Sequence, residues 1–458
     1  MSSEPFSRDD FLNDGEWGAP FREIEGLVGG ELVHAERQER WRPAWFFDIE
    51  RDGERLPLYY RGDRGLEPDG VDTLRREMQV LQLLEAHGIP VPHIYGFCES
   101  LPGIVMERAP GRANLATADS EDERRAVLRH YLDLLAEIHR LPTSKFEALG
   151  CPMPQTAAER SLGDIPRWER MYQRGKNQPE PTIELILGWL RENVPTHRER
   201  VAPVVGDAGQ FLFDQGRVTA VIDIEFAALS DPLADVGALL SRDLSEPLGD
   251  LSAGIQYYRE ITGEDFERDD LLYQAVRFMV VTPLSTCYLC AKPPPGLNLV
   301  QYESWNSVYG RIPLQLIAEI EGVEIESPDL GHPRDHRYGV VSDALVEMLR
   351  ASAKDGDPYA WDTAARLAEY VRAVDQHGAR FEAEDLDETA ALLGRRPSDW
   401  RDADAALEQL AMQATRDTRP GLLRLLVRRT LRREALLGAA MRELVGAEAQ
   451  RIELPPLG

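Results

Sequence analysis

The sequence has few cysteines and no long apolar run. Its four cysteines, Cys98, Cys151, Cys287 and Cys290, are too few and too scattered for a disulfide framework. Cys287 and Cys290 form a CxxC pair, but no second ligand pair follows at a spacing that would complete a zinc site. No stretch approaches the roughly 18 apolar residues of a membrane span. These absences favour reduced thiols and argue against a disulfide scaffold and a membrane protein.

Basic side chains are also scarce. Lysine and arginine number 52 against 79 aspartate and glutamate residues, which gives a formal net charge of −27. This charge repels a phosphate backbone, so we expect no nucleic-acid partner. It would attract a cationic substrate, but acidic surfaces mainly serve solubility and do not define a substrate class. Residues 1–18 lack the basic start and apolar stretch of a secretory signal, which predicts a cytoplasmic protein.

The length of 458 residues predicts two or three packed units at roughly 150 residues each. Residues 1–107 are predicted to form a small α+β unit. Strand-like runs occupy 29–38, 44–53, 55–62 and 103–111. Between them, 71–88 has the apolar spacing of a helix, with Leu74, Met78, Leu81 and Leu84 on one face, Gly88 just past its end, and Asp69 or Asp72 as its cap. Two prolines then force an extended segment.

Helical patterns dominate the rest of the chain. Residues 108–325 are interrupted by one β-like island at 203–224, and a polar stretch with proline and glycine at 324–337 has the composition of a linker. Residues 326–458 contain amphipathic segments that predict a bundle of about four or five helices. The basic run at 428–433 is interpreted as a solvated helix face. We expect this unit to form a homo-oligomer or to bind a partner protein.

The β-like island contains a predicted hairpin. Two short apolar strands, 210–213 and 217–223, are joined by Asp214-Gln215-Gly216, a turn sequence whose glycine supplies positive φ. Asp207 precedes the first strand and Asp223 closes the second. Antiparallel pairing therefore brings the two carboxylates to the same end of the ribbon.

Two converging carboxylates repel each other, and a divalent cation would neutralise them. Mg²⁺ binds hard oxygen ligands and keeps waters and phosphates in its shell, which suits Asp223, Gln210 and a nucleotide. Asp207 is then left to orient and deprotonate a hydroxyl group, which is the role of a loop carboxylate in phosphoryl transfer.

The same segment resembles the aminoglycoside phosphotransferase and choline-kinase-like family, whose pattern is HGDxxxxN, a hairpin ending in IDxE, and GDPxxDLA. The matching elements are Gly206-Asp207, Gln210, residues 222–225 and residues 230–235. Val205 stands where the family has histidine, and Gln210 replaces asparagine in a shorter loop. The resemblance implies a bilobal protein-kinase-like α+β fold, with a small β-rich N-lobe over 1–107 and a mainly helical C-lobe over 108–325. The helical accessory domain, 326–458, follows.

The resemblance also implies roles for individual residues. Asp207 is the expected catalytic base, Asp223 and Gln210 are the expected metal ligands, and Asp235 is the expected structural anchor. Arg61 stands at the end of the third strand, where kinases place a phosphate-binding lysine, and Glu77 stands where the family has the acid that pairs with it. Main-chain groups near Glu107 and Arg108 are expected to meet adenine. Phosphates are covered by a turn through Arg40 and Arg42, or that turn is merely exposed. His139 is interpreted as a packing residue.

These patterns predict an enzyme that uses ATP and Mg²⁺ to phosphorylate a hydroxyl group of a small molecule. A metabolite such as a hydroxyacyl compound is preferred over an aminoglycoside as acceptor, because of the added helical unit. The alternative is a catalytically weak pseudokinase that binds a nucleotide or acts as a scaffold.

Overall fold

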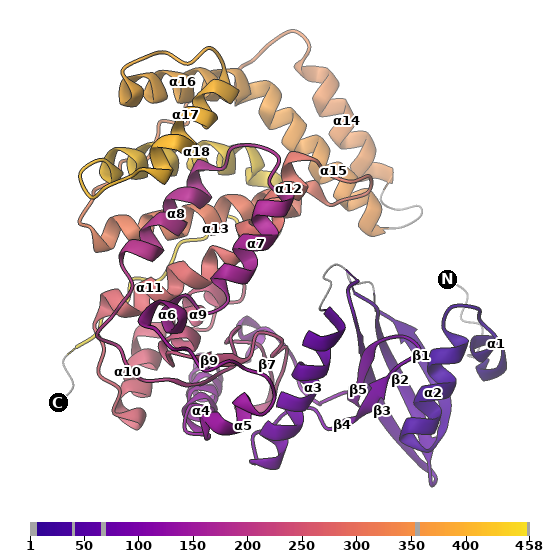
Figure 1. Ribbon diagram of the computed structural model, residues 1–458. Helices are drawn as coiled ribbons and strands as arrows, with labels where there is room; N and C mark the ends of the chain where they lie inside the picture. The colour runs from indigo at the N-terminus through magenta and orange to yellow at the C-terminus, as the bar shows by residue number, and fades with distance from the viewer. Residues whose placement is uncertain (1–6, 39–41, 66–69, 353–357, 456–458) are drawn as a thin grey trace.

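The structure is a computed structural model that describes residues 7–38, 42–65, 70–352 and 358–455 (Figure 1). Three parts follow one another along the chain. The sheet-containing part that ends at β5 is called the N-lobe below. The mainly helical part up to α13 is the C-lobe, and the helices from α14 onward are the C-terminal unit. In Figure 1 the C-terminal unit lies above the C-lobe, and the N-lobe lies to its right.

The N-lobe is built on a five-stranded antiparallel sheet in the order β1-β2-β3-β5-β4. The strands are β1 (Glu31–Arg37), β2 (Ala44–Arg51), β3 (Glu54–Gly62), β4 (Ile94–Cys98) and β5 (Gly103–Glu107). Successive side chains of a strand point to opposite faces. Val105 accordingly packs in the cluster of α2 (Gly18–Val28), whereas Ile104 and Met106 pack in the cluster of α3 (Gly70–Ala86). One helix thus covers each face of the sheet.

The predicted strands and the helix near 71–88 are confirmed. Gly88 has a φ of +79° just beyond α3, and Asp72 lies in the first turn of α3, whereas Asp69 lies outside the described residues. The extended segment that the two prolines predicted contains β4. Two helices before the sheet, α1 (Arg8–Leu12) and α2, were not predicted.

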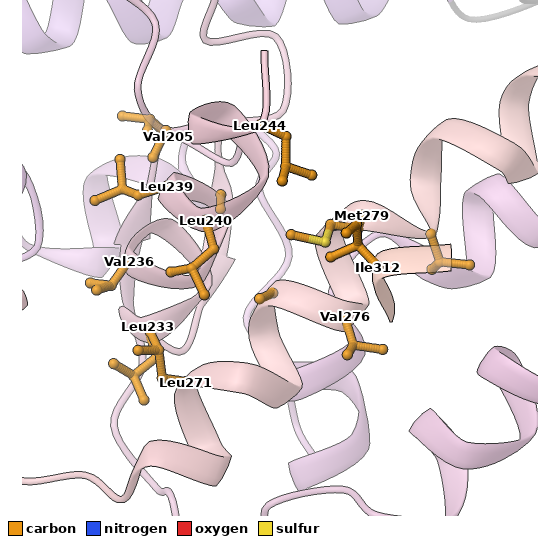
Figure 2. Packing of buried hydrophobic residues seen from close by; sticks show 14 of the residues in the cluster. Val205, Leu233, Val236, Leu239, Leu240, Leu244, Leu271, Val276, Met279 and Ile312 are labelled. Atoms are coloured by element: carbon orange, nitrogen blue, oxygen red, sulfur yellow. The ribbon is translucent and has the colours of Figure 1, made fainter. Parts of the chain in front are cut away.

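The C-lobe consists of helices around two short β-ribbons. Its helices are η1 (Leu115–Thr117), α4 (Glu121–Ile138), α5 (Thr143–Glu147), α6 (Ala157–Leu162), α7 (Ile165–Gly175), α8 (Pro181–Glu192), α9 (Leu233–Asp243), α10 (Leu251–Thr262), α11 (Arg268–Met279), α12 (Val281–Ala291) and α13 (Leu299–Ile320). Figure 2 shows the core, in which Leu239 and Leu240 of α9 pack near Val276 and Met279 of α11 and Ile312 of α13.

The predicted hairpin is confirmed. β7 (Phe211–Asp214) pairs antiparallel with β8 (Arg217–Val221), and the turn residues Gln215 and Gly216 both have positive φ, at 47° and 77°. A turn with positive φ at both central positions matches the right-handed twist of its strands. A second ribbon pairs β6 (Ala202–Val204) with β9 (Ala228–Ser230). The two ribbons position the loops that carry Asp207 and Asp223.

The C-terminal unit is helical, as predicted. Its elements are α14 (Gly339–Ser352), α15 (Pro358–Ala373), a π-helical turn η2 (Val374–Gly378), α16 (Ala379–Leu393), α17 (Trp400–Met412), α18 (Arg419–Leu437) and η3 (Gly438–Ala440). α17 packs on α8 and α18 packs on α13, and Leu407 and Leu422 belong to the same apolar core as the C-lobe. The predicted boundary at residue 326 therefore separates helices that share one core, and it remains a prediction.

Ion pairs and the chain end fix the C-terminal unit to the C-lobe. The buried guanidinium of Arg311 in α13 donates to Glu434 at 2.7 Å, and the buried Arg419 of α18 pairs with Glu321 and Glu192. After η3 the chain returns along the C-lobe, where Gln450 donates to Asp243 at 2.8 Å. Within the described residues, the helices are all too short or too polar to cross a bilayer.

Candidate active site

The loop that carries Asp207 is held by Asp235 of α9. The N–H groups of Val205 and Gly206 donate to the two carboxylate oxygens of Asp235, at 2.9 and 2.8 Å. The His139 ring lies 3.0 Å from the same carboxylate and 2.7 Å from the Tyr258 hydroxyl, with its side chain fully buried. These contacts fit the anchoring role implied for Asp235 and the packing role of His139.

The loop keeps its shape although Val205 replaces the family histidine. Val205 is buried, and Figure 2 shows it beside Leu239 of α9. Gly206 has a φ of +86°, and a side chain there would meet the Phe226 carbonyl oxygen at 2.3 Å. The Gly209 N–H donates to the Tyr131 hydroxyl at 2.8 Å. Main-chain hydrogen bonds and apolar packing therefore fix this loop without the histidine.

The Asp207 carboxylate is held from both sides. The Gln210 amide donates to its Oδ2 at 2.5 Å, and Arg242 from the end of α9 donates to its Oδ1 at 2.7 Å. Burial raises the pKa of Asp207 to about 6, against the lowering effect of Arg242, and the Asp223 carboxylate adds to the rise. Because Phe211 pairs with Val221, Asp207 and Asp223 leave the hairpin at the same end.

Asp223 lies at the end of the hairpin, facing the N-lobe. Its φ of +56° is in the left-handed region, which a residue with a side chain adopts only when its surroundings hold it there. Arg61 of β3 donates to its carboxylate. Burial alone would raise the pKa of Asp223, but the guanidinium groups of Arg61 and Arg42 outweigh burial and lower this pKa. Asp223 is thus held as a carboxylate.

Arg61 and Glu77 form the ion pair that the resemblance implied. The Arg61 Nε donates to Glu77 Oε2 of α3 at 3.1 Å, and both side chains are buried. Burial raises the pKa of Glu77 to about 7, against the effect of Arg61, with Asp223 and Glu225 adding to the rise. Three carboxylates, those of Glu77, Asp223 and Glu225, therefore surround the Arg61 guanidinium.

Glu225 lies among three arginine side chains. Its carboxylate lies 3.1 Å from the Arg42 guanidinium, 2.6 Å from that of Arg64 and 3.5 Å from that of Arg61. Arg42 is buried, so it is not merely part of an exposed turn, and Arg40 lies outside the described residues. Several guanidinium groups thus converge beside Asp223, which is the charge that a polyphosphate requires.

The predicted adenine-binding segment lies at the end of β5. The Glu107 N–H donates to the His93 carbonyl at 2.8 Å, and the Arg108 N–H donates to the Pro57 carbonyl at 3.0 Å. The Arg108 side chain pairs with Asp48 at 3.0 Å. Because both N–H groups are used within the N-lobe, an adenine ring would have to meet other main-chain groups of this segment. The role of Glu107 and Arg108 remains a prediction.

The residues present fit a magnesium nucleotide. Asp223 and Gln210 offer hard oxygen ligands, and Arg61, Arg42 and Arg64 offer guanidinium donors for phosphates. Within the described ranges, histidine, cysteine, aspartate and glutamate side chains form no cluster of three or more that could cage a metal ion. A Mg²⁺ ion would therefore take part of its shell from phosphate oxygens and water, as this ion commonly does.

Three site residues were not predicted from the sequence, namely Arg242, Arg64 and Glu225. Glu225 was part of the matched motif, but no role followed from its position. Arg242 follows Asp235 along α9 and reaches Asp207 only because α9 packs against the loop that carries Asp207. Only the fold brings the end of this helix to the loop, and we find no sequence signal that would have predicted the contact.

Part of the chain is similar to proteins of known family. A model described as the phosphotransferase enzyme family, APH, matches residues 65–272. Acyl-CoA dehydrogenase family member 10 of Mus musculus is 28% identical over 214 residues, which cover 40% of this chain and 19% of that protein. Acyl-CoA dehydrogenase family member 11 of Homo sapiens is 27% identical over 173 residues, or 35% of this chain and 22% of that protein. The chain thus spans about a fifth of the length of these curated relatives.

A solved structure shares the fold. A Ralstonia eutropha protein described as a candidate aminoglycoside phosphotransferase superposes with a TM-score of 0.52 at 17% identity, over 66% of this chain and 98% of that chain. At this identity the likeness concerns the fold alone. Together with the antiparallel sheet and the helical remainder, it confirms the predicted α+β kinase-like architecture.

Proposed function

We propose, from the match of residues 65–272 to the phosphotransferase enzyme family, that the protein transfers the γ-phosphoryl group of ATP to a hydroxyl group of a small molecule. The observation that carries this proposal is the convergence of Asp207, Asp223 and the Arg61–Glu77 pair at the junction of the two lobes. A base, a metal-binding carboxylate and a phosphate-binding cation are the parts that phosphoryl transfer requires.

Asp207 is the proposed catalytic base. The acceptor hydroxyl would donate its hydrogen bond to Asp207, and its oxygen would form the new bond to the γ-phosphorus as the bond to the β-phosphate oxygen breaks. The proton passes to Asp207, and ADP leaves. Gln210 and Arg242 hold the carboxylate in one orientation, and with a pKa of about 6 it is mostly ionised near neutral pH. A base with a pKa near the working pH is well suited to this step.

Arg61, Arg42 and Arg64 are the proposed phosphate ligands. Glu77 orients the Arg61 guanidinium, and Glu225 orients the other two. Mg²⁺ bound by Asp223 and Gln210 would neutralise phosphate charge and align the γ-phosphate. Before the nucleotide arrives, the arginine side chains are paired with carboxylates. The incoming phosphates would then replace carboxylates as partners of these side chains.

A hydroxyacyl compound is the proposed acceptor, in preference to an aminoglycoside. Arg242 places a guanidinium group directly beside the base, which opposes the approach of a polycationic sugar. The acyl-CoA dehydrogenase family names of the relatives also favour an acyl compound.

The test is an assay of ATP consumption with hydroxyacyl-CoA compounds and with kanamycin as acceptors. Turnover should require Mg²⁺ and a hydroxyacyl acceptor, and should disappear in Asp207→Asn while nucleotide binding persists. Increased aminoglycoside resistance of an expression host that carries the gene would instead overturn the acceptor preference. Full turnover by Asp207→Asn would remove this residue from its role.

A second candidate function, a nucleotide-binding scaffold, is favoured by one observation. The α14 helix exposes apolar side chains, with Val340, Val341 and Met348 at 68%, 67% and 60% exposure. Thermal-shift measurements with ATP, with and without Mg²⁺, separate the two functions because a ligand that binds only the folded state raises its melting temperature. A Mg²⁺-dependent rise supports the kinase, and a rise without turnover on any acceptor supports the scaffold.

A further inference from the structure

A polar cleft lies between the C-lobe and the C-terminal unit, and none of the proposed active-site residues lines it. Its two adjoining parts measure about 500 and about 460 Å³ and share Glu180, Asp404 and Arg433 among their lining residues. The walls come from the segment before α8, from α12 and α13, and from α16, α17 and α18. We call this hollow the accessory cleft. Its volume is that of a small-molecule site.

The α13 helix separates the accessory cleft from the active site. Glu303, Asn306 and Ser307 of α13 line the cleft. Tyr309 on a neighbouring face of the same helix donates to the Ser241 carbonyl at 3.4 Å, in the stretch of α9 that ends beside Asp207. The accessory cleft is therefore a separate hollow that shares one wall with the active-site side of the C-lobe.

Carboxylates gather inside the accessory cleft. Glu180, Glu303 and Asp404 all line the same part of the cleft. Burial raises the pKa of Glu180, and the Asp404 and Glu303 carboxylates add to this rise. Asp404 is neutralised by Arg429 at 2.5 Å. Glu180 accepts one hydrogen bond, from the Gln178 amide at 2.9 Å. The third acid, Glu303, lies farther from its charged partner, Arg433.

The Glu303 carboxylate is incompletely satisfied. Its residue is only 8% exposed, yet among the described residues no hydrogen-bond donor reaches its Oε2. The Nε of Arg433 stands 3.7 Å away, too far for a hydrogen bond, although the Glu303 carboxylate is the main cause that raises the pKa of Arg433. The hydroxyl group of Ser307, a residue that is 1% exposed and lines the same cleft, likewise has no partner in the described part of the chain.

Buried polar atoms nearly always have partners, so two unpartnered groups in the lining of one hollow indicate that something else completes them. Ordered water would do so in part. An ammonium group would do so more fully, because Glu303 and Glu180 outnumber the one loosely paired guanidinium, Arg433. Tyr370 and Trp400, which also line the cleft, could present aromatic faces to a cation.

We propose that the accessory cleft binds a small organic cation, whose ammonium group is held by Glu303 and Ser307. The proposal concerns a binding site and not a second reaction, and it does not depend on the proposed phosphotransferase activity. The formal charge of −27 would draw such a ligand to the protein. The site also gives the C-terminal unit a role, because α16, α17 and α18 supply one of its walls.

Isothermal titration calorimetry of the full chain with spermidine tests the proposal, in 150 mM NaCl to screen the charged surface. One saturable site is expected. Glu303→Gln, which removes the charge and keeps the shape, should weaken binding at least about tenfold. Arg433→Met, which removes the competing guanidinium, should tighten binding instead. Opposite shifts from these two variants are not expected of a general loss of structure.

Glu260→Gln is the matched control, because Glu260 is an exposed residue of α10 that does not line the cleft. It should leave spermidine affinity unchanged, and circular dichroism should confirm that all variants fold. The proposal is overturned if spermidine shows no saturable site, or if Glu303→Gln and Glu260→Gln weaken binding equally. Saturable binding of citrate that Arg433→Met abolishes would assign the site to an anion and also overturn it.

Discussion

The candidate active site where the two lobes meet, here called the interlobe site, holds the same kinds of side chain as the accessory cleft but pairs them differently. At the interlobe site, Arg61 and Arg242 donate hydrogen bonds to Glu77 and Asp207, at 3.1 and 2.7 Å. In the accessory cleft, Arg433 stands 3.7 Å from its acid and makes no hydrogen bond to it. Both places are rich in charge, but the Glu77 and Asp207 carboxylates accept hydrogen bonds from guanidinium groups, whereas Glu303 Oε2 accepts none within the described residues.

The difference indicates two uses of charge. A closely paired carboxylate keeps one orientation and a defined pKa, which suits a group that must act on a reacting atom. A loosely paired carboxylate can still accept hydrogen bonds from another group, which suits a side chain that binds a ligand. Substitutions of matched chemistry at the two places should therefore have unequal effects.

The largest effect is expected at Asp207. Asp207→Asn should lower the turnover number by about 10²–10⁴-fold, the usual contribution of a general base. The same substitution removes a hydrogen-bonded carboxylate from the buried side of Arg242, so a moderate loss of stability is expected beside the loss of turnover. Turnover and thermal melting of the same preparation measure the two effects. A loss of turnover no larger than the unfolded fraction explains would mean that Asp207 serves the fold and not the reaction.

Glu77→Gln should have the next largest effect, on stability. It removes a charged partner from the buried Arg61, and hydrogen bonds to charged groups contribute about 1.5–3 kcal/mol. Urea unfolding of the full chain should show a loss in this range, accompanied by weaker ATP binding. Glu85→Gln on the exposed part of the same helix is the control and should change neither quantity appreciably. Equal stability of Glu77→Gln and the original chain would break the contrast between the two sites.

The pH profile of kcat/KM should show how Arg242 tunes the base. The pKa of Asp207 is about 6, so activity should fall as the pH drops through this value and the base becomes protonated. Arg242→Met removes the group that lowers this pKa, and the acid limb should move to higher pH. Each unit by which this pKa rises should lower kcat/KM about tenfold at pH values below it, and should change kcat/KM little at higher pH. An unchanged limb with a lower plateau would leave Arg242 a purely structural role.

The smallest effect is expected at Glu303. Because its contact with Arg433 is long and not hydrogen-bonded, Glu303→Gln should change the free energy of unfolding by less than about 1 kcal/mol. Urea unfolding beside Glu77→Gln measures the contrast directly. A loss as large as that of Glu77→Gln would mean that Glu303 is a structural ion-pair partner, and the distinction between the two places would fail.

The parts that sequence predicted best are governed by local chemistry. The turn at Gln215 and Gly216 needs two positive φ angles and contains a glycine, so the hairpin and the meeting of Asp207 with Asp223 followed from it. The N-lobe strands were equally clear, since they alternate and are separated by turn residues. The α2 helix was not predicted, although Phe21, Ile24 and Val28 carry its buried face. Gly18 and Pro20 have low helix propensity, but proline is tolerated in a first turn.

The parts that sequence could not predict depend on distant segments. Arg242 reaches Asp207 across the packing of α9, and Glu303 meets Arg433 from a helix that lies more than a hundred residues earlier in the chain. The spacing of residue types along the sequence does not indicate such contacts. The accessory cleft likewise exists only because α17 and α18 pack on α8 and α13, and amphipathic patterns alone do not specify which helices become neighbours.

The α13 helix runs unbroken for 22 residues, which makes it about 33 Å long. It carries Glu303 near its beginning and Tyr309 near its middle. One helix therefore contacts both the accessory cleft and the segment of α9 that ends beside Asp207. Thermodynamic reciprocity then constrains any communication between them. If a magnesium nucleotide changes the affinity for a bound amine by some factor, the amine must change the affinity for the nucleotide by the same factor.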